Sequence, residues 1–191
     1  LVEEQGVRNC RIVEVGCGQG SFLRCLVAAD AGNTGYGFDP SYRGPASDLG
    51  GRLRFETCFF NEDVKGIPSD VVICRHVIEH VEDPVGLLKS IRGALAASSG
   101  GRVFLETPCL GWILRRRAFW DFFYEHCSLF TASSLTTALE TAGFGVTRAD
   151  AVFGGQYLWL EAALCDGECS VSRNPGAVPS LAAELGARED R

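Results

Sequence analysis

Residues 11–20 read RIVEVGCGQG, an apolar run followed at once by a glycine-rich turn. The run predicts a buried strand over 11–15, and the spacing of apolar residues over 21–29 predicts a helix directly after the turn. Gly16 and Gly18 have no Cβ, so the backbone can turn tightly there and lie close against a ligand. A strand, a glycine-rich turn and a helix in this order predict a nucleotide-binding α/β unit.

Strands alternate with helices along the rest of the chain. Asp83 and Pro84 are a typical helix start, an N-cap followed by proline, and that helix is predicted to run to about Ala97. Apolar residues recur at helical spacing over 131–142, which predicts a second amphipathic helix. Further strands are predicted at residues 36–38, 53–60, 70–74, 101–106, 146–153 and 156–163. Alternation of this kind predicts a mostly parallel α/β sheet with helices on both faces.

Composition limits the class of protein. The chain has 191 residues, 46% apolar and 22% charged, which is typical of one soluble globular domain. Its formal net charge of -6 argues against general nucleic-acid binding, and no apolar stretch approaches the roughly 20 residues of a membrane span. Residues 1–164 are expected to form the domain, and 165–191, rich in small residues, a tail or the start of a linker. The lack of any methionine indicates a fragment or a processed chain.

The nine cysteines do not have the pattern of a disulfide framework. Those in apolar or glycine-rich segments are expected to be buried free thiols, which indicates a reducing compartment such as the cytoplasm; they are Cys17, Cys25, Cys58 and Cys74. Cys165 and Cys169 are a close pair, but their spacing is not that of a zinc knuckle. No metal site is therefore assigned from the sequence.

Two acidic residues help to choose the nucleotide ligand. Asp39 follows the second predicted strand, where a carboxylate can accept hydrogen bonds from both ribose hydroxyls. Glu14 would repel the phosphates of a dinucleotide, but it suits a cofactor with a free amino group and a sulfonium. Ser21 also stands where a dinucleotide fingerprint has its last glycine. S-adenosylmethionine is therefore favoured over a nicotinamide dinucleotide, with contacts expected from Glu14, Gly16, Cys17, Gly18, Gly20, Asp39 and Pro40.

These motifs resemble those of the class I S-adenosylmethionine-dependent methyltransferases. The glycine turn with Glu14 is similar to their first motif, Asp39 to their second, and residues 70–84 to their fourth strand and the loop after it. The segment from Glu106 to His126 is similar to a narrower group, the sugar C-methyltransferases and related polysaccharide-pathway enzymes. The resemblance implies a Rossmann-like, doubly wound sheet of seven strands with one antiparallel strand near the C-terminal end. It also implies methyl transfer to a small molecule, with carbon methylation of a nucleotide-linked sugar as the first expectation.

Two histidine-containing segments are the candidate acid–base groups. Removal of a proton from the acceptor needs a positioned base, and His126 is the first choice, with Glu125 as its carboxylate neighbour. Tyr124 is placed to donate a hydrogen bond to an enolate oxygen. His80 follows the fourth predicted strand, near the expected methyl donor, and is a second candidate to bind or deprotonate the acceptor. A structural role, as a helix cap or a sheet-edge seal, is the alternative for this cluster.

Four further residues are expected at the cofactor. Phe60 and Asn61 follow the third predicted strand and are candidates to stack on adenine and hydrogen-bond to it. Arg75 and His76 follow the fourth predicted strand and are expected to line the pocket. Burial in the core is an equally good interpretation of Phe60.

The segment 112–124 combines aromatic side chains with Arg115, Arg116 and Arg117. It is a candidate substrate lid whose arginines could hold a diphosphate, although a short run of charges is usually solvated surface. No membrane or nucleic-acid partner is expected, and nothing indicates the oligomeric state. O- or N-methylation of another metabolite, a nicotinamide-dependent oxidoreductase and a non-catalytic cofactor-binding module stay open as alternatives.

Overall fold

A computed structural model describes residues 1–61, 67–122, 125–165, 179–180 and 182–183. Its centre is a sheet of eight strands in the order β3-β4-β2-β1-β5-β6-β8-β7. The strands are β1 (Arg11–Val15), β2 (Thr34–Phe38), β3 (Ser47–Asp48), β4 (Leu53–Glu56), β5 (Val71–Arg75), β6 (Arg102–Pro108), β7 (Phe144–Val152) and β8 (Tyr157–Leu164). The five adjacent strands β4, β2, β1, β5 and β6 run parallel to one another. Strand β8 runs antiparallel to both of its neighbours, β6 and β7.

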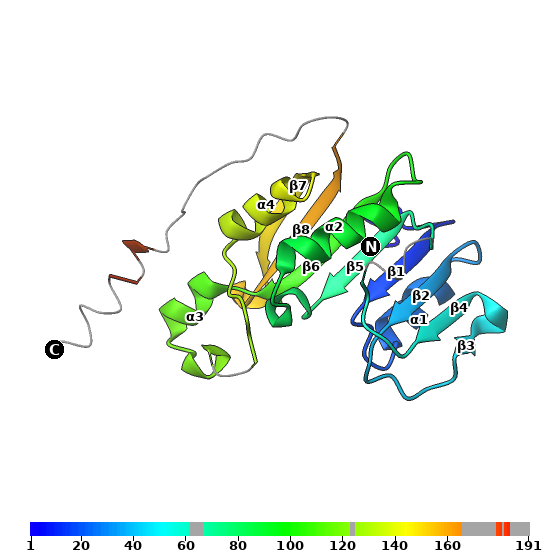
Figure 1. Ribbon diagram of the computed structural model, residues 1–191, viewed down its shortest axis with the longest axis horizontal. Helices are drawn as coiled ribbons and strands as arrows, with labels where there is room; N and C mark the ends of the chain where they lie inside the picture. The colour runs from blue at the N-terminus through cyan, green and yellow to red at the C-terminus, as the bar shows by residue number, and fades with distance from the viewer. Residues whose placement is uncertain (62–66, 123–124, 166–178, 181, 184–191) are drawn as a thin grey trace.

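Helices cover both faces of the sheet, as Figure 1 shows. On one face α2 (Pro84–Leu95) and α4 (Ala132–Thr141) bury leucine and isoleucine side chains against the strands. On the other face α1 (Ser21–Ala28) packs over the first strands and forms a second core. Two cores on opposite faces confirm the predicted doubly wound architecture.

Local sequence explains where the helices begin. The Asp83 side chain accepts a hydrogen bond from the Gly86 N–H, and Pro84 opens α2. Thr131 and Ser134 form a reciprocal capping box at the start of α4. Both devices satisfy backbone N–H groups that a helix start would otherwise leave without partners.

The fold differs from the prediction at three places, two in the sheet and one in the predicted lid. It has eight strands, not seven, because β3 adds a two-residue antiparallel pairing at the edge beside β4. The third predicted strand, 53–60, ends at Glu56. The predicted lid contains a helix, α3 (Leu110–Arg116), followed by a 3-10 turn over Phe119–Phe122.

The cysteines and the tail give further outcomes. Cys17 and Cys74 are buried free thiols as predicted, but the predicted burial of Cys25 and Cys58 is wrong, because both thiols are exposed. Cys165 is disulfide-bonded. Most of the predicted tail lies outside the described residues. In the part of the chain that the structure describes, no helix is long and apolar enough to cross a bilayer.

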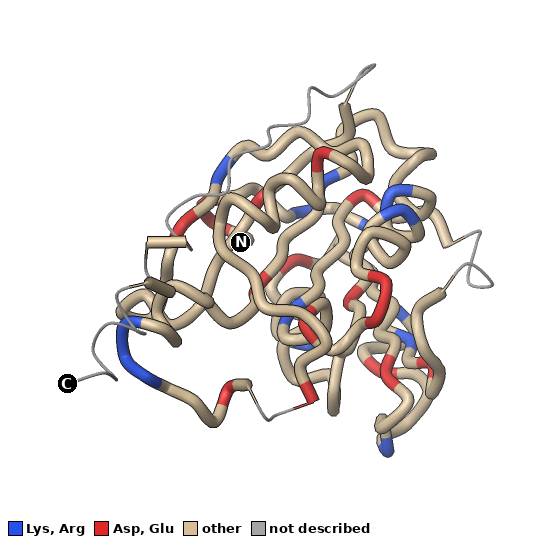
Figure 2. Tube along the Cα trace, turned by 60° about the vertical axis from the view of Figure 1, so that its left-hand side comes forward, with Lys and Arg blue, Asp and Glu red and all other residues tan. Residues whose placement is uncertain are grey.

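Lys and Arg residues are interspersed with Asp and Glu residues along the described chain (Figure 2). The longest basic run is Arg115–Arg117, where all three side chains are exposed. Arg115 and Arg116 lie in the last turn of α3, where cations interact favourably with the helix dipole. This run is therefore explained by local helix electrostatics without a ligand.

Candidate cofactor and acceptor site

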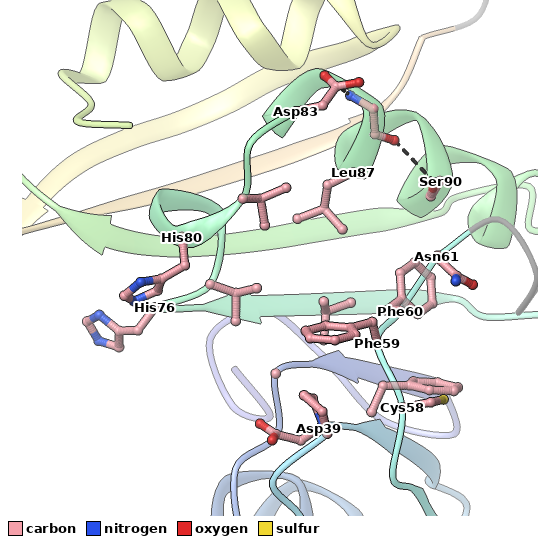
Figure 3. A pocket seen from close by; sticks show the side chains of 17 residues that line it. Asp39, Cys58, Phe59, Phe60, Asn61, His76, His80, Asp83, Leu87 and Ser90 are labelled. Atoms are coloured by element: carbon pink, nitrogen blue, oxygen red, sulfur yellow. Dashed lines mark hydrogen bonds between the residues drawn. The ribbon is translucent and has the colours of Figure 1, made fainter. Parts of the chain in front are cut away.

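A pocket of about 560 Å³ lies where β1, β2 and β5 end. The carboxyl ends of parallel strands are the usual place for a ligand in a doubly wound sheet, and the volume is that of a small-molecule site. The pocket is lined by Val15, Gly16, Phe38, Asp39, Pro40, Cys58, Phe59, Phe60, Asn61, His76, Val77, His80, Val81, Asp83, Gly86, Leu87 and Ser90. Figure 3 shows His76 and His80 at one end, and Phe60 and Asn61 at the other.

Gly16 of the glycine turn forms part of the pocket wall, and glycine is the residue that fits at both Gly16 and Gly20. Gly16 has a φ of 69°, and a Cβ at this position would overlap the Val77 side chain. Gly20 has a φ of 75°, and a Cβ there would overlap the ring of Phe55. Left-handed backbone at such angles is costly for any residue with a side chain. The turn can therefore bring its backbone close to a ligand.

Asp39 faces the pocket from the end of β2. Its Oδ2 atom accepts a hydrogen bond from the Gly18 N–H at 2.8 Å, and its Oδ1 atom accepts from the Ser41 N–H at 2.7 Å. Partial burial raises the pKa of this carboxyl, but the hydrogen bonds from Ser41 and Gly18 outweigh burial and hold the pKa below its ordinary value. The group is an ionised, fixed acceptor with lone pairs left for hydroxyl donors.

Glu14 lies beneath the turn, with only 3% of the residue exposed. Burial raises the pKa of its carboxyl to about 7, although the nearby Arg75 opposes the shift. Among the described residues, its Oε2 atom has no hydrogen-bond partner. A buried carboxylate oxygen in this state is costly, and an ammonium group would satisfy it. The site thus fits a ligand with a free amino group better than one with phosphates.

Arg75 and Cys17 support the turn from outside the pocket lining. The Arg75 guanidinium stacks on the Phe22 ring at 4.3 Å and lies 3.4 Å from the Glu106 carboxylate. Burial raises the pKa of the Cys17 thiol to about 12, so this thiol is unreactive at neutral pH. Neither side chain lines the pocket, and neither do Glu14, Gly18 or Gly20, although all five were expected at the cofactor.

The end of the pocket farthest from the histidines is aromatic. The Phe60 ring packs edge-on against Phe38 at 5.4 Å and lines the pocket beside Asn61. Cys58 and Phe59 lie next to them, and Phe59 is 73% exposed. An aromatic wall with an amide at its edge suits a planar heterocycle. Phe60 and Asn61 were expected here; Cys58 and Phe59 were not, because the segment after β4 has no readable periodicity.

His76 anchors the opposite end through two acidic partners. Its Nε2 atom lies 2.7 Å from Glu106 Oε1, and its Nδ1 atom lies 3.7 Å from Glu79 Oε1. The hydrogen bond to Glu106 and the ion pair with Glu79 raise the pKa of His76 to about 9, so the imidazole is a cation at neutral pH. The Thr107 hydroxyl donates to the other oxygen of Glu79. Glu106 could not be identified from the sequence as the partner of His76, because the β5–β6 register is what brings it beside this turn.

The two histidine segments, far apart in the sequence, lie side by side. The Ser128 N–H donates to the Glu79 carbonyl at 3.0 Å, and the Cys127 thiol donates to the His80 carbonyl at 3.4 Å. The rings of His80 and His126 are 4.9 Å apart between centroids. The predicted pair of acid–base candidates is therefore brought together at the end of the pocket that His80 lines.

The expected carboxylate partner of His126 is replaced by a backbone group. The His126 Nδ1 atom lies 2.8 Å from the Asp121 carbonyl, and the His80 Nδ1 atom lies 3.1 Å from the Glu125 carbonyl. Glu125 is exposed and has a backbone φ of 46°. The group of Glu125 that contacts a histidine is thus its backbone carbonyl, at His80, and not its carboxylate at His126. Tyr124 lies outside the described residues.

Comparisons with known proteins identify the family of the chain. Residues 3–149 match the model of a family described as "Methyltransferase domain". A ubiquinone biosynthesis O-methyltransferase of Aeromonas salmonicida is 32% identical over 108 residues, 53% of this chain and 44% of that protein. A protein of the same description from Vibrio cholerae is 30% identical over 113 residues, 56% of this chain and 45% of that protein. The chain thus spans less than half the length of these curated relatives.

Solved structures share the fold at low sequence identity. One is the Burkholderia thailandensis 1,6-didemethyltoxoflavin-N1-methyltransferase, with its substrate and S-adenosylhomocysteine bound. Its TM-score is 0.66 at 18% identity, over 87% of this chain and 75% of that one. A magnesium protoporphyrin IX methyltransferase from Synechocystis, also with S-adenosylhomocysteine, has a TM-score of 0.64 at 20% identity, over 86% of this chain and 78% of that one.

Proposed function

The chain belongs to the methyltransferase domain family, and from this premise we propose that it transfers the methyl group of S-adenosylmethionine to an oxygen atom of a small molecule. The observation that carries the proposal is the pocket itself. One pocket joins an ionised Asp39, an aromatic wall at Phe60 and a histidine cluster at its far end. Relatives at about 30% identity are O-methyltransferases, which supports oxygen as the acceptor atom.

The pocket's residues fit the parts of the cofactor in order. S-adenosylmethionine supplies an electrophilic methyl group together with its leaving group. Asp39 accepts hydrogen bonds from the ribose hydroxyls, with Pro40 beside it. Phe60 and Asn61 contact the adenine ring. Glu14 lies beneath the pocket wall and does not line the pocket, and we assign its buried Oε2 atom, which has no partner among the described residues, to the cofactor's ammonium group.

The histidine end holds the methyl acceptor. His80 and His126 approach one another there, and the carbonyl partner of each Nδ1 atom leaves Nε2 as the basic nitrogen of the neutral ring. A basic nitrogen at this end accepts the proton of an acceptor hydroxyl as its oxygen attacks the methyl carbon. Positioned proton transfer of this kind contributes about 10²–10⁴-fold in rate. His76, held by Glu106, orients the acceptor as a fixed cation.

Carbon methylation of a nucleotide-linked sugar is the second candidate. The Glu125–His126 segment favours it, because a base beside the pocket is what proton removal next to a carbonyl requires. The exposed arginines of α3 are available to a diphosphate, but the helix dipole already explains their position. A cytoplasmic location is part of the same proposal; the free thiols of seven described cysteines support it, whereas the disulfide at Cys165 does not.

The test is methyl transfer from labelled cofactor to a panel of hydroxylated aromatic compounds and nucleotide-linked keto sugars. Mass spectrometry of the products identifies the methylated atom. For whichever acceptor is used, His126→Ala is expected to lower turnover at least about tenfold while S-adenosylhomocysteine binding is unchanged. Cys25→Ser, an exposed change on α1, is the matched control. Wild-type turnover in His126→Ala would remove this histidine from the mechanism, and methylation of carbon alone would favour the second candidate.

A further inference from the structure

We propose that Glu79, His80 and His126 form a binding site for a divalent cation of the Zn²⁺ class, which holds the acceptor oxygen at the end of the cofactor pocket. The inference deepens the proposed function and rests on it for the role of the ion. The cysteine spacing indicates no metal site, whereas these three ligands come from two segments, 79–80 and 126, that meet only in the fold.

The distances suit an ion after a small closure. One potential ligand atom from each of the three side chains lies within 4.8 Å of the others. Zinc bonds to nitrogen or carboxylate oxygen are about 2.1 Å, so two ligand atoms on one ion can be at most about 4.2 Å apart. The difference is about 0.6 Å, and His80 is exposed and His126 half-buried, so a small shift that keeps both Nδ1 hydrogen bonds can supply it. Two imidazoles with one carboxylate favour Zn²⁺, Co²⁺ or Ni²⁺ over Mg²⁺.

The imidazole tautomers provide an independent argument. Because a carbonyl oxygen only accepts hydrogen bonds, the Nδ1 atoms of His80 and His126 must donate to the carbonyls of Glu125 and Asp121. Each neutral ring therefore has its lone pair on Nε2. Histidines that ligate metals characteristically donate the other ring N–H to a carbonyl or carboxylate, which fixes the tautomer and the ring orientation. Both rings have this arrangement.

The carboxylate ligand is also held in place. Glu79 is buried, with 1% of the residue exposed, and the Thr107 hydroxyl donates to its Oε2 atom at 2.9 Å. The Ser128 N–H fixes the Glu79 backbone against the segment that carries His126. The three ligands thus stand on a frame of hydrogen bonds rather than on independent surface loops, and such pre-organisation is what metal sites require.

Three protein ligands leave a coordination position for a substrate oxygen, as in catalytic zinc sites. His80 lines the pocket, so that position faces the acceptor end. An acceptor hydroxyl bound to the ion has a lowered pKa and loses its proton to water. The oxyanion then attacks the methyl carbon, an oxygen–carbon bond forms, and the carbon–sulfur bond breaks with its electron pair leaving on sulfur. The ion therefore takes over the activation that the two imidazoles would otherwise provide as free bases.

The experiment is a metal titration of chelator-treated chain, followed by calorimetry and, for Co²⁺, by its visible absorption. Single-site binding of Zn²⁺ and Co²⁺ is expected, with Mg²⁺ much weaker. Glu79→Gln and His126→Gln are each expected to weaken Co²⁺ binding by at least about a hundredfold, since even outer-sphere changes cost 10–100-fold. Glu82→Gln, a nearby exposed carboxylate, is the matched control and should bind like wild type. Thermal unfolding verifies that each variant is folded.

Several outcomes overturn the site. One is Co²⁺ affinity in the ligand variants equal to that of Glu82→Gln. A second is a Co²⁺ spectrum typical of thiolate coordination in the wild type, and a third is Mg²⁺ binding as tight as Co²⁺ binding. Full methyl transfer by chelator-treated enzyme, with the chelator still present, overturns the ion's role. S-adenosylhomocysteine binding to metal-free chain is measured in parallel. Its loss would contradict the proposed function, whereas the Co²⁺ titration judges the metal site separately.

Discussion

Replacement of Glu14 by glutamine separates the electrostatics of the cofactor site from its shape. Burial raises the pKa of Glu14 to about 7, and its Oε2 atom has no partner among the described residues. If this oxygen accepts from the ammonium group of the cofactor, the bound state requires the ionised carboxylate. Cofactor binding must then supply the free energy of ionisation whenever the free protein holds Glu14 protonated. Affinity is therefore expected to rise with pH until about pH 7 and to level off above it.

The magnitude follows from the pKa. Well below pH 7 each unit of acidity costs about 1.4 kcal/mol, so affinity should fall about fivefold between pH 7 and 6, where half of Glu14 is ionised at the start, and about tenfold again by pH 5. Isothermal titration of S-adenosylhomocysteine across this range measures the slope. The charged groups that face Glu14 are Arg75 and Asp39, and the pKa of Asp39 is held below its ordinary value. Cys17, with a pKa of about 12, also stays constant.

Glu14→Gln is the control that isolates the effect, because it keeps the shape and removes the titration. Its affinity is expected to be weaker than wild type above about pH 7 and to lose the slope between pH 5 and 7. Since the raised pKa means that ionisation destabilises the fold, its free energy of unfolding should exceed that of wild type by about 2–3 kcal/mol above pH 7, with the difference vanishing below about pH 4.5. Equal slopes in the two proteins would refute the assignment of Glu14 to the cofactor's ammonium group.

Three further changes test the fold and the turn. Gly16→Ala places a Cβ against Val77 at a φ of 69°, so we expect a loss of about 1–3 kcal/mol of stability in thermal unfolding, together with weaker S-adenosylhomocysteine binding in calorimetry. The hydrogen bond from Arg11 lowers the pKa of Asp70 to about 2, so Asp70→Asn should lower the free energy of unfolding by about 1 kcal/mol above pH 4, a value discounted for the partial exposure of the pair. Urea titrations should show this difference disappearing as pH falls toward 2. Leu88→Ala, fully buried in α2, should cost about 2–5 kcal/mol in urea unfolding, and a loss under 1 kcal/mol would contradict the packing described.

Elements with strong local signals were predictable from the sequence. The buried run before the glycine turn gave β1, and the Asp83–Pro84 start gave α2. The two-residue strand β3 was missed because only backbone hydrogen bonds join it to β4 at the edge of the sheet, and such a short strand shows no hydrophobic alternation in the sequence. Helix α3 was missed because its short aromatic and basic segment was interpreted as a substrate lid, with no helix assigned to it.

The site was predictable where a residue lies at the end of a strand. Asp39 and His76 directly follow β2 and β5, so the parallel arrangement places both at the pocket. Glu106 and Glu79 were missed as partners of His76, because register between strands and the turn after β5 decide those contacts. The Asp121 carbonyl that orients His126 was unpredictable for the same reason, since backbone partners leave no trace in the sequence.

The most direct test of the central claim is calorimetric titration of the chain with S-adenosylhomocysteine, beside Asp39→Ala as the variant that removes the ribose acceptor. Saturable binding at one site in the wild type, with affinity greatly reduced in a folded Asp39→Ala, is the predicted result. A folded wild-type chain that binds no S-adenosylhomocysteine, or an Asp39→Ala variant that binds it equally well, would contradict the account of this pocket.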